Sequence, residues 1–272
     1  MCGICGFTGA VEADLPILKA MCDVMAHRGP DGEGQYIDDG IALGHRRLSL
    51  IDLEGGNQPM VRATGDHASA VTSPALMPDG APCASPEAAA AKGDYAIVFN
   101  GEIYNYRDLR AELFGIKPFY YTVQNGEAGP QFIFASEIKC ILEHPAYERA
   151  LNEDALEQYL CFQFSALDET FFKGIFKLPP AHCMTVRADG AVEMRRYWRP
   201  EYAFDEGRSR EDTVEAIDAA MRESVRYHNV ADVEVGSFLS SGIDSSYMAA
   251  CLAKENPAIK TFTVGFAEYE GE

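Results

Sequence analysis

Met1-Cys2-Gly3-Ile4-Cys5-Gly6 opens the chain, and the interpretation of the remaining sequence depends on it. If Met1 is removed, which the small side chain of Cys2 permits, the new first residue carries both a thiol and a free α-amine. An α-amine has a pKa near ~8 and can accept the thiol proton directly or through one water, so Cys2 is a complete nucleophile and base. No histidine is then needed. The alternative is that Cys2 and Cys5 form a C-x-x-C pair, which is typical of redox pairs and of half a metal site.

Composition narrows the class of protein. The 272 residues, 47% of them hydrophobic, suffice for one large or two ordinary domains. The net charge of −19 predicts a surface that repels phosphate backbones and anionic lipids, so neither nucleic acid nor membrane is expected as a partner. The chain does not open with a basic region followed by an apolar run, and no stretch approaches a membrane-spanning length, which predicts a soluble, cytoplasmic protein. Eight scattered cysteines agree with a reducing compartment.

Three strands and one helix are predicted in the first fifty residues. The apolar pattern places strands at 3–9, 34–38 and 41–51 and puts Leu18, Met21, Cys22 and Met25 on one face of a helix. The turn signal His27-Arg28-Gly29-Pro30-Asp31-Gly32 then reverses the chain. Arg46 and Arg47 interrupt the third strand, and one of them is expected to face a pocket because an arginine on the core face needs an anionic partner. An edge-strand arginine in solvent is the alternative.

A polar motif follows the next predicted strand. Residues 63–93 are dominated by Ala, Ser, Pro and Gly and predict a loop or insertion. The buried strand predicted at 95–99 then runs into Asn100-Gly101-Glu102, which directs an amide, a bare backbone N–H and a carboxylate to one point. Such groups are suited to hold an oxyanion and an ammonium. A simple turn before a helix at 105–113 is the alternative.

Short elements continue up to a predicted domain boundary. Strands at 119–123 and 131–135 form a hairpin over Asn125-Gly126, a short helix spans 137–143, a helix begins after the N-cap Asn152, and strands at 183–187 and 192–198 pair with each other. Trp198-Arg199-Pro200 and the polar stretch to Arg208 then predict a linker.

Beyond this linker the pattern is βαβ. A helix capped at Ser209, with Val214, Ile217, Met221 and Val225 on one face, precedes a strand at 233–239, a helix at 245–255 and a strand at 260–266. The turn Ser240-Ser241-Gly242-Ile243-Asp244-Ser245-Ser246 joins the first strand to the second helix. Backbone N–H groups, hydroxyls and the helix dipole converge there on an anion such as phosphate. The sequence has no Gly-Lys-Ser/Thr at this turn, so it is not a Walker A loop, and kinase or GTPase chemistry is not indicated.

Taken together, these motifs resemble a known family. Those that carry the resemblance are Cys2-Gly3-Ile4-Cys5-Gly6, His27-Arg28-Gly29-Pro30-Asp31, Arg47-Leu48-Ser49-Leu50-Ile51-Asp52, Asn100-Gly101-Glu102-Ile103-Tyr104-Asn105-Tyr106 and Phe114-Gly115-Ile116-Lys117-Pro118. In this order they resemble class II glutamine amidotransferases, and the turn at 240–246 resembles the pyrophosphate loop of ATP pyrophosphatases. The closest family is glutamine-hydrolysing asparagine synthetase. The resemblance implies an α/β fold: an N-terminal αββα sandwich of the N-terminal-nucleophile hydrolase type at 1–198, then the beginning of a parallel-sheet adenine-nucleotide-binding α/β domain at 209–272.

The resemblance also implies roles for residues of both domains. Cys2 would attack the glutamine side-chain amide and form a thioester, with Asn100 and Gly101 holding the oxyanion. Glutamine would bind at Arg47, Leu48, Ser49, Leu50, Ile51, Asn100, Gly101 and Glu102, with Arg47 on its carboxylate and Glu102 on its ammonium. ATP would bind at Phe238, Ser240, Ser241, Gly242, Asp244, Ser245 and Val264, and Asp244 would hold Mg²⁺ through the pyrophosphate. By resemblance, ATP adenylates aspartate in the second domain, and ammonia from the first displaces AMP to give asparagine.

The sequence departs from the family pattern at three places. Leu113 runs directly into Phe114-Gly115, where the family has a further helix, several core strands and a Ser-Asp-Thr-Glu-like motif, whose aspartate would share the substrate ammonium with Glu102. Ser241 stands where the pyrophosphate loop has its middle glycine. The sequence stops at Glu272, before the remaining ATP and aspartate contacts of the family.

These departures leave two alternatives to the synthetase function open. One is an inactive or partial remnant of the family that acts at most as a binding protein. The other is a related amidotransferase-ligase with another acceptor. Under the synthetase hypothesis glutamine, aspartate and ATP are the small-molecule partners, and a homodimer is a further expectation because the family is often dimeric.

Overall fold

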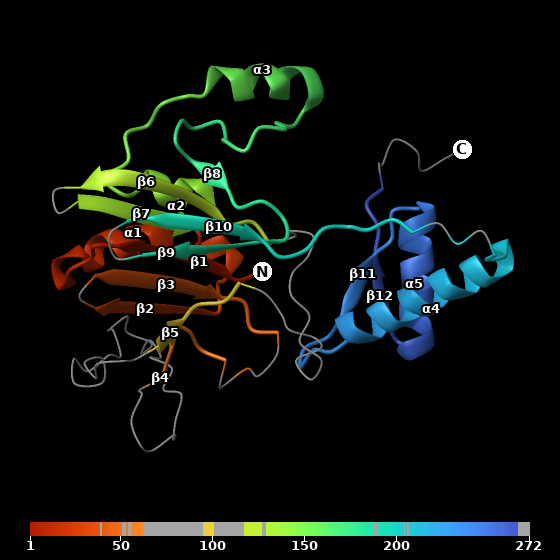
Figure 1. Ribbon diagram of the computed structural model, residues 1–272. Coiled ribbons are helices and arrows are strands. Elements are labelled where there is room, and N and C mark those ends of the chain that lie inside the picture. The colour runs from red at the N-terminus through yellow and green to blue at the C-terminus, as the bar shows by residue number, and fades with distance from the viewer. Residues whose placement is uncertain are drawn as a thin grey trace. The chain divides into compact units, whose positions relative to one another are not determined.

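The computed structural model describes residues 1–38, 40–50, 53, 56–62, 95–100, 117–126, 129–187, 190–203, 205 and 207–265. These residues form two compact units (Figure 1). Unit 1 holds the described residues up to Pro200 apart from Leu50 and Leu53, and unit 2 holds Leu50, Leu53 and the described residues from Glu201 onward.

A six-stranded sheet organises unit 1. Its strands are β1 (Gly3–Thr8), β2 (Gly32–Asp38), β3 (Ile41–Arg47), β6 (Tyr120–Gly126), β7 (Gly129–Ala135) and β8 (Phe176–Lys177), in the spatial order β2-β3-β1-β7-β6-β8. All neighbouring strands are antiparallel. The opening strand therefore lies inside the sheet, with Cys5 opposite Gly44 on one side and opposite Ala135 on the other. This arrangement confirms a mixed α/β fold with an antiparallel sheet.

Two helices pack against this sheet and close its core. They are α1 (Leu15–Asp23) and α2 (Ile138–Leu142), and the 3₁₀ turns η1 (Glu12–Asp14) and η2 (Ala26–Arg28) flank α1. The core combines Leu18, Met21 and Cys22 of α1 with Phe7 of β1 and Ile133 of β7, all fully buried. The helical spacing of apolar residues predicted this face, although Met25, also buried, lies beyond the end of α1. Burial of each large apolar side chain contributes about 1.5–3 kcal/mol.

The remaining elements of unit 1 include two short antiparallel ribbons and one helix. The ribbons are β4 (Met60–Arg62) with β5 (Tyr95–Ile97) and β9 (His182–Val186) with β10 (Val192–Arg196), and the helix is α3 (Glu153–Phe162). Asn152 caps α3 as predicted, because its side-chain oxygen accepts the Ala155 N–H at 3.3 Å. The strand predicted as buried at 95–99 is shorter, and Ile97 is 58% exposed. Burial was therefore predicted wrongly, since an apolar run alone does not show whether a strand is covered.

The hairpin of β6 and β7 also extends further than expected. Asn125 pairs with Pro130 and Gly126 with Gly129, so Asn125-Gly126 continues the ladder instead of forming the turn. Asn-Gly is a strong turn signal, but cross-strand pairing outweighs it here.

Unit 2 is a short βαβ arrangement preceded by a helix. It contains α4 (Arg210–His228), β11 (Gly236–Phe238), α5 (Ile243–Glu255) and β12 (Lys260–Phe262), and the two strands pair in parallel. Ser209 and Asp212 form a complete capping box at the start of α4. Val225 packs on Cys251 and Leu252 of α5. Of the apolar face predicted for α4, Val225 alone is buried, whereas Val214 and Ile217 are more than half exposed.

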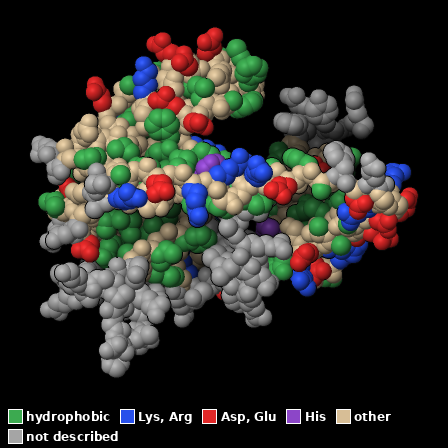
Figure 2. Space-filling model, in the orientation of Figure 1, with side chains coloured by type: hydrophobic (Ala, Val, Ile, Leu, Met, Phe, Trp, Pro, Cys, Tyr) green, Lys and Arg blue, Asp and Glu red, His purple; other side chains and the backbone are tan. Residues whose placement is uncertain are grey.

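Acidic side chains gather on two helices. Figure 2 shows them over α3, where Glu153, Asp154 and Glu157 are exposed, and over the first turns of α4, where Glu211 and Asp212 are exposed. In the described part of the chain, no helix is both long and apolar enough to cross a membrane.

Two buried histidines are expected to make unit 1 sensitive to acid. Burial lowers the pKa of His45 and of His144 from the usual 6.5 to about 4. Arg47 lowers the pKa of His45 further, a hydrogen bond with the Phe99 backbone opposes the shift, and Asp14 opposes the shift at His144. Between pH 6.5 and 4 the unfolded chain therefore binds protons that the folded chain does not, so the free energy of unfolding falls as the pH falls.

The size of this acid effect can be measured. A depression of this size corresponds to roughly 3 kcal/mol for each histidine at most. Urea unfolding of unit 1 at pH 7 and pH 4.5 should show the loss, and His144→Gln should reduce the difference between the two pH values. If the free energy of unfolding falls by the same amount between pH 7 and pH 4.5 in wild type, in His45→Gln and in His144→Gln, other groups cause the acid sensitivity.

Candidate functional site

Cys2 lies immediately before β1, and it contacts Arg28 and Leu48, the residue that follows β3. The Leu48 N–H points at the Cys2 sulfur at 3.4 Å, and the Leu48 carbonyl lies 3.7 Å from the same atom. Burial lowers the pKa of the Met1 amine, which precedes Cys2 in the chain. A partly buried thiol can act as a nucleophile when a neighbouring base takes its proton.

The second cysteine of the C-x-x-C pair has a different environment. Cys5 is fully buried in the core, and its sulfur lies 3.6 Å from the Cys22 sulfur. Burial raises the pKa of the Cys5 thiol well above its usual range, so this thiol is unreactive. Across the described residues, no group of three or more His, Cys, Asp or Glu side chains could hold a metal ion. The redox-pair and half-metal-site alternatives for Cys2 therefore gain no support.

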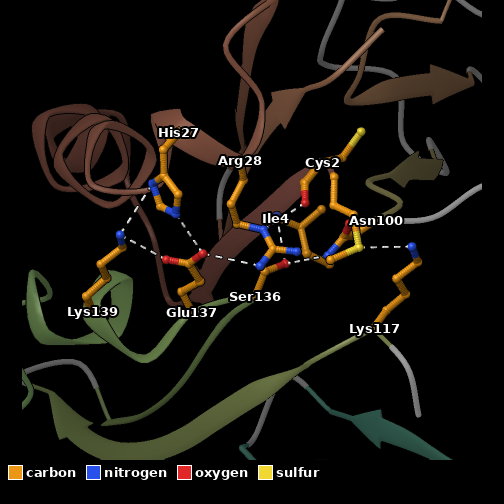
Figure 3. Close-up of polar contacts among 10 residues, drawn as sticks. Cys2, Ile4, His27, Arg28, Asn100, Lys117, Ser136, Glu137 and Lys139 are labelled. Atoms are coloured by element: carbon orange, nitrogen blue, oxygen red, sulfur yellow. Dashed lines mark hydrogen bonds and ion pairs between the residues drawn. The ribbon is translucent and has the colours of Figure 1, made fainter. Parts of the chain in front are cut away.

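Arg28 connects Cys2 to a cluster of charges (Figure 3). Its Nε donates to the Cys2 carbonyl at 2.9 Å, and its Nη1 donates to Glu137 at 3.2 Å. Glu137 also pairs with His27 and with Lys139, each at 3.0 Å. Burial disfavours charge on Glu137, but hydrogen bonds from Lys139, Arg28 and His27 outweigh it and lower the pKa of this carboxyl. The anionic Glu137 thus fixes the guanidinium that holds the Cys2 backbone.

The Ser136 hydroxyl links the candidate oxyanion residue to the nucleophile strand (Figure 3). Ser136 Oγ accepts the Ile4 N–H at 3.0 Å, and the Ser136 N–H donates to the Ile4 carbonyl at 2.8 Å. The Asn100 amide nitrogen lies 2.9 Å from the same Ser136 Oγ. Asn100 is 8% exposed, and its Oδ1 atom has no hydrogen-bond partner among the described residues. In Figure 3 the Cys2 sulfur points away from the Glu137 cluster.

The two strand arginines have separate partners. Arg46 pairs with Glu33 at 2.8 Å and with Asp23 at 3.0 Å, and its Nε donates to the Cys22 carbonyl. Arg47 is buried, and its Nη1 donates to Asn57 Oδ1 at 2.8 Å. Both side chains are therefore enclosed by protein, and an edge-strand arginine in solvent is excluded.

The turn signal at 27–32 holds the end of β3. Asp31 donates its N–H to the Arg47 carbonyl at 3.0 Å, and its carboxylate accepts the Ser49 N–H at 2.8 Å. Gly29 must be glycine, because a Cβ there would lie 2.3 Å from the Arg46 carbonyl carbon and 2.4 Å from the Arg47 nitrogen. This close approach positions the segment after Arg47, including the Leu48 N–H that contacts Cys2.

The structure brings some of the predicted glutamine-site residues together. Cys2 contacts Leu48, and Asn100 reaches the Cys2 strand through Ser136. Leu48 and Ser49 belong to unit 1, whereas Leu50 belongs to unit 2. Ile51, Gly101 and Glu102 lie outside the described residues, as do the predicted insertion at 63–93 and the predicted helix at 105–113.

The loop predicted to hold phosphate joins β11 to α5. The hydroxyls of Ser240 and Ser245 lie 3.1 Å apart, and Ser245 also donates to the Gly242 carbonyl at 3.1 Å. Gly242 is the N-cap of α5, and a Cβ there would make only ordinary contacts. Asp244 in the first turn of α5 is exposed, and so are Phe238 and Val264, the residues predicted to flank adenine. Hydroxyls, helix N–H groups and an acidic side chain match the chemistry of a phosphate group with Mg²⁺.

Ser241 adopts a backbone conformation that favours glycine, with φ at +62°. A non-glycine residue in this left-handed region costs roughly 1–2 kcal/mol. Ser241→Gly should therefore stabilise unit 2 by up to about 1 kcal/mol, after the greater flexibility of glycine in the unfolded chain is included. Calorimetric unfolding would show the gain. Ser240→Gly is the matched control and should destabilise, because it removes the hydroxyl bonded to Ser245. A loss of stability in Ser241→Gly would show that the backbone at Ser241 is not strained.

Sequence reasoning missed Ser136 and Glu137, the residues that connect the site. A signal for them exists: both directly follow the apolar run Phe132-Ile133-Phe134-Ala135. The same logic, a polar group after an apolar strand pattern, points to Asn100.

Comparisons with known proteins agree with these motifs. A family model described as a glutamine amidotransferase domain matches residues 1–73 and 113–198, and one described as asparagine synthase matches residues 216–272. Cys2, Arg47 and Ser136 fall inside the first match, and Asn100 lies between its two segments.

The curated relatives are mostly glutamine-hydrolysing asparagine synthetases. Asparagine synthetases [glutamine-hydrolyzing] 1 and 3 of Bacillus subtilis are 31% and 29% identical over 97% and 98% of this chain. An amidase, chry2, of Gibberella zeae is 29% identical over 93% of this chain. The chain spans about half the length of the first relatives, 46% and 48%. The alignment with the first of them covers 327 positions, so that relative has residues in this region for which the chain has no counterpart.

Proposed function

Because this chain belongs to the glutamine amidotransferase family, we propose that it releases ammonia from glutamine at Cys2 and supplies it to an ATP-dependent synthesis of asparagine from aspartate. The observation that carries the proposal is the surroundings of Cys2. The thiol lies against the Leu48 N–H, Arg28 holds the Cys2 carbonyl, and Ser136 links Asn100 to the same strand.

The hydrolysis proceeds through a thioester. With Met1 removed, the Cys2 amine takes the thiol proton, and the sulfur attacks the side-chain carbonyl carbon of glutamine. The carbonyl oxygen becomes an oxyanion, for which Asn100 and the Gly101 N–H are the donors. The amide nitrogen then leaves as ammonia with the proton returned by the amine. A water attacks the thioester, which releases glutamate and restores the Cys2 thiol.

Recognition of glutamine requires charges for its α-carboxylate and ammonium. Arg47 is the partner of the carboxylate and Glu102 the partner of the ammonium, and residues 48–51 form the rest of the binding segment. Burial and the contact with Asn57 support this role for Arg47, because they hold the guanidinium in one orientation. A carboxylate bound in a partly desolvated site gains from a cation that is already ordered.

The second step belongs to the domain that begins at residue 209. Ser240, Ser241, Gly242, Asp244 and Ser245 hold the pyrophosphate of ATP, Phe238 and Val264 flank its adenine, and Asp244 holds Mg²⁺ through the pyrophosphate. Bound Mg²⁺ neutralises phosphate charge during adenylation of aspartate. The neighbouring Ser240 and Ser245 hydroxyls, from the turn before α5 and its first turn, support this assignment. Ammonia from the first domain then displaces AMP to give asparagine.

The finer architecture is part of the same proposal. Residues 1–198 form the αββα sandwich of N-terminal-nucleophile hydrolases, and residues 209–272 form the start of the parallel adenine-nucleotide-binding sheet. The central position of β1 in an antiparallel sheet and the parallel pair β11–β12 support these assignments. Glutamine, aspartate and ATP are the substrates, the protein acts in the cytoplasm, and a homodimer is the working form.

Steady-state glutamine hydrolysis tests the proposal. The purified chain, shown by mass spectrometry to lack Met1, should convert glutamine to glutamate and ammonium in equal amounts. The same protein should exchange pyrophosphate into ATP in the presence of aspartate and Mg²⁺. A folded, Met1-free chain without glutamine hydrolysis would overturn the amidotransferase function of this chain. Hydrolysis without aspartate-dependent exchange would favour a different acceptor.

A further inference from the structure

The Asn100 carboxamide has a hydrogen-bonding problem that its neighbours can solve. In the structure its Nδ2 lies 2.9 Å from Ser136 Oγ, and its Oδ1 is buried with no partner among the described residues. Ser136 Oγ already accepts the Ile4 N–H at 3.0 Å. In this orientation the hydroxyl accepts two hydrogen bonds while the amide oxygen receives none, and an unsatisfied buried acceptor is costly.

Rotation of the carboxamide by 180° changes which of its two ends lacks a hydrogen-bond partner. The two ends of an asparagine amide have nearly the same size, so both orientations fit the same space. After rotation, Ser136 still accepts from Ile4 and donates its own proton to Oδ1 over the same 2.9 Å. The unpartnered end is then Nδ2, a donor. A vacant buried donor is what an oxyanion requires.

We propose that Ser136 is a positioning residue that turns the Asn100 amide, with Oδ1 toward Ser136 and Nδ2 toward the substrate oxyanion. This inference rests on the proposed glutamine hydrolysis. The Ile4 N–H occupies one lone pair of Ser136 and thereby directs the hydroxyl proton toward Asn100. Because Ile4 lies two residues after the nucleophile, the strand that carries Cys2 also sets the orientation of the oxyanion donor.

Substitution of Ser136 by alanine tests the proposal. The oriented donor is lost, so kcat for glutamine hydrolysis should fall on the order of 10²-fold while KM changes less than about 3-fold, since the amide acts on the transition state. Thr122→Val is a matched control: it removes another fully buried hydroxyl from the same sheet and should leave kcat unchanged. Wild-type kcat in folded Ser136→Ala would overturn the proposal.

A double-mutant cycle separates positioning from a merely structural role. If Ser136 acts through Asn100, Ser136→Ala should have no further effect on kcat in an Asn100→Ala background. If it acts by holding the Ile4 backbone instead, the two losses should multiply, and the proposal fails. Ser136→Cys covers the case in which alanine does not fold, because the thiol keeps a weak donor and acceptor and should give an intermediate kcat.

A measurement without activity keeps this inference distinct from the proposed function. The side-chain amide signals of Asn100 in ¹⁵N NMR spectra, assigned by their loss in Asn100→Ala, should shift in Ser136→Ala, and those of Asn57 should not. Unchanged Asn100 signals would overturn the positioning role even in a chain that hydrolyses no glutamine. Shifted signals in an inactive wild type would support the contact between Ser136 and the Asn100 amide and reject the hydrolase function alone.

Discussion

Alanine in place of Cys2 is expected to abolish glutamine hydrolysis, with a loss on the order of 10³-fold or more in kcat. In the proposed mechanism the thiol provides the electron pair that forms the thioester, and the nearby Cys5 thiol cannot replace it because it is buried in the core. Folding should change little, because the Cys2 sulfur is only partly buried and its hydrogen bonds with Leu48 are long. Ammonium release and urea unfolding measure the two effects.

Two controls make this result specific to the nucleophile. Cys161→Ala removes an exposed thiol from α3 and should retain full activity. A preparation that retains Met1 should be inactive although its thiol is intact, because its free amine belongs to the wrong residue. Equal hydrolysis by Cys2→Ala and wild type would show that another group performs the chemistry.

Alanine in place of Gly44 is expected to destabilise unit 1 by about 1–3 kcal/mol or more. Gly44 lies in β3 opposite Cys5, and an added Cβ would lie 2.5 Å from the Cys22 sulfur and 2.8 Å from the Cys5 sulfur. Both thiols are fully buried, so neither can move into solvent. The core must therefore shift, and close-packed interiors resist such shifts. Urea unfolding followed by circular dichroism would measure the loss.

Matched variants distinguish steric overlap of the new Cβ from a general destabilisation by alanine in β-strands. Gly32→Ala, in β2, places its Cβ 3.6 Å from the Arg47 Cβ, an ordinary contact, and should change stability by less than about 0.5 kcal/mol. Combining Gly44→Ala with Cys22→Ala should recover part of the stability, because the nearest overlapping atom is removed. Equal losses in Gly44→Ala and Gly32→Ala would contradict the packing argument.

Local signals determined a large part of this protein from its sequence. Three features depend on residues a few positions apart and are present as predicted: the N-cap Asn152, the cap at Ser209 and the helical face of Leu18, Met21 and Cys22. The prediction of Cys2 as a nucleophile also rests on one residue, which would carry both a thiol and an amine. Such features need only short-range geometry, which residue order fixes.

Tertiary structure decided the contacts between distant segments. The sequence could not give the protein partners of the two strand arginines, which are Glu33 and Asp23 for Arg46 and Asn57 for Arg47. Nor could it show that Val214 and Ile217 are exposed, since periodicity marks an apolar face but not what covers it.

The same reason explains the site. Arg28 reaches Glu137 across 109 positions, and Ile4 reaches Ser136 across 132, because β1 and β7 are neighbours in the sheet. Motifs along the chain predicted Cys2 as the residue that attacks. Strand order in space decided which residues hold it, since hydrogen bonds form between groups that folding brings within about 3 Å, whatever their separation in sequence.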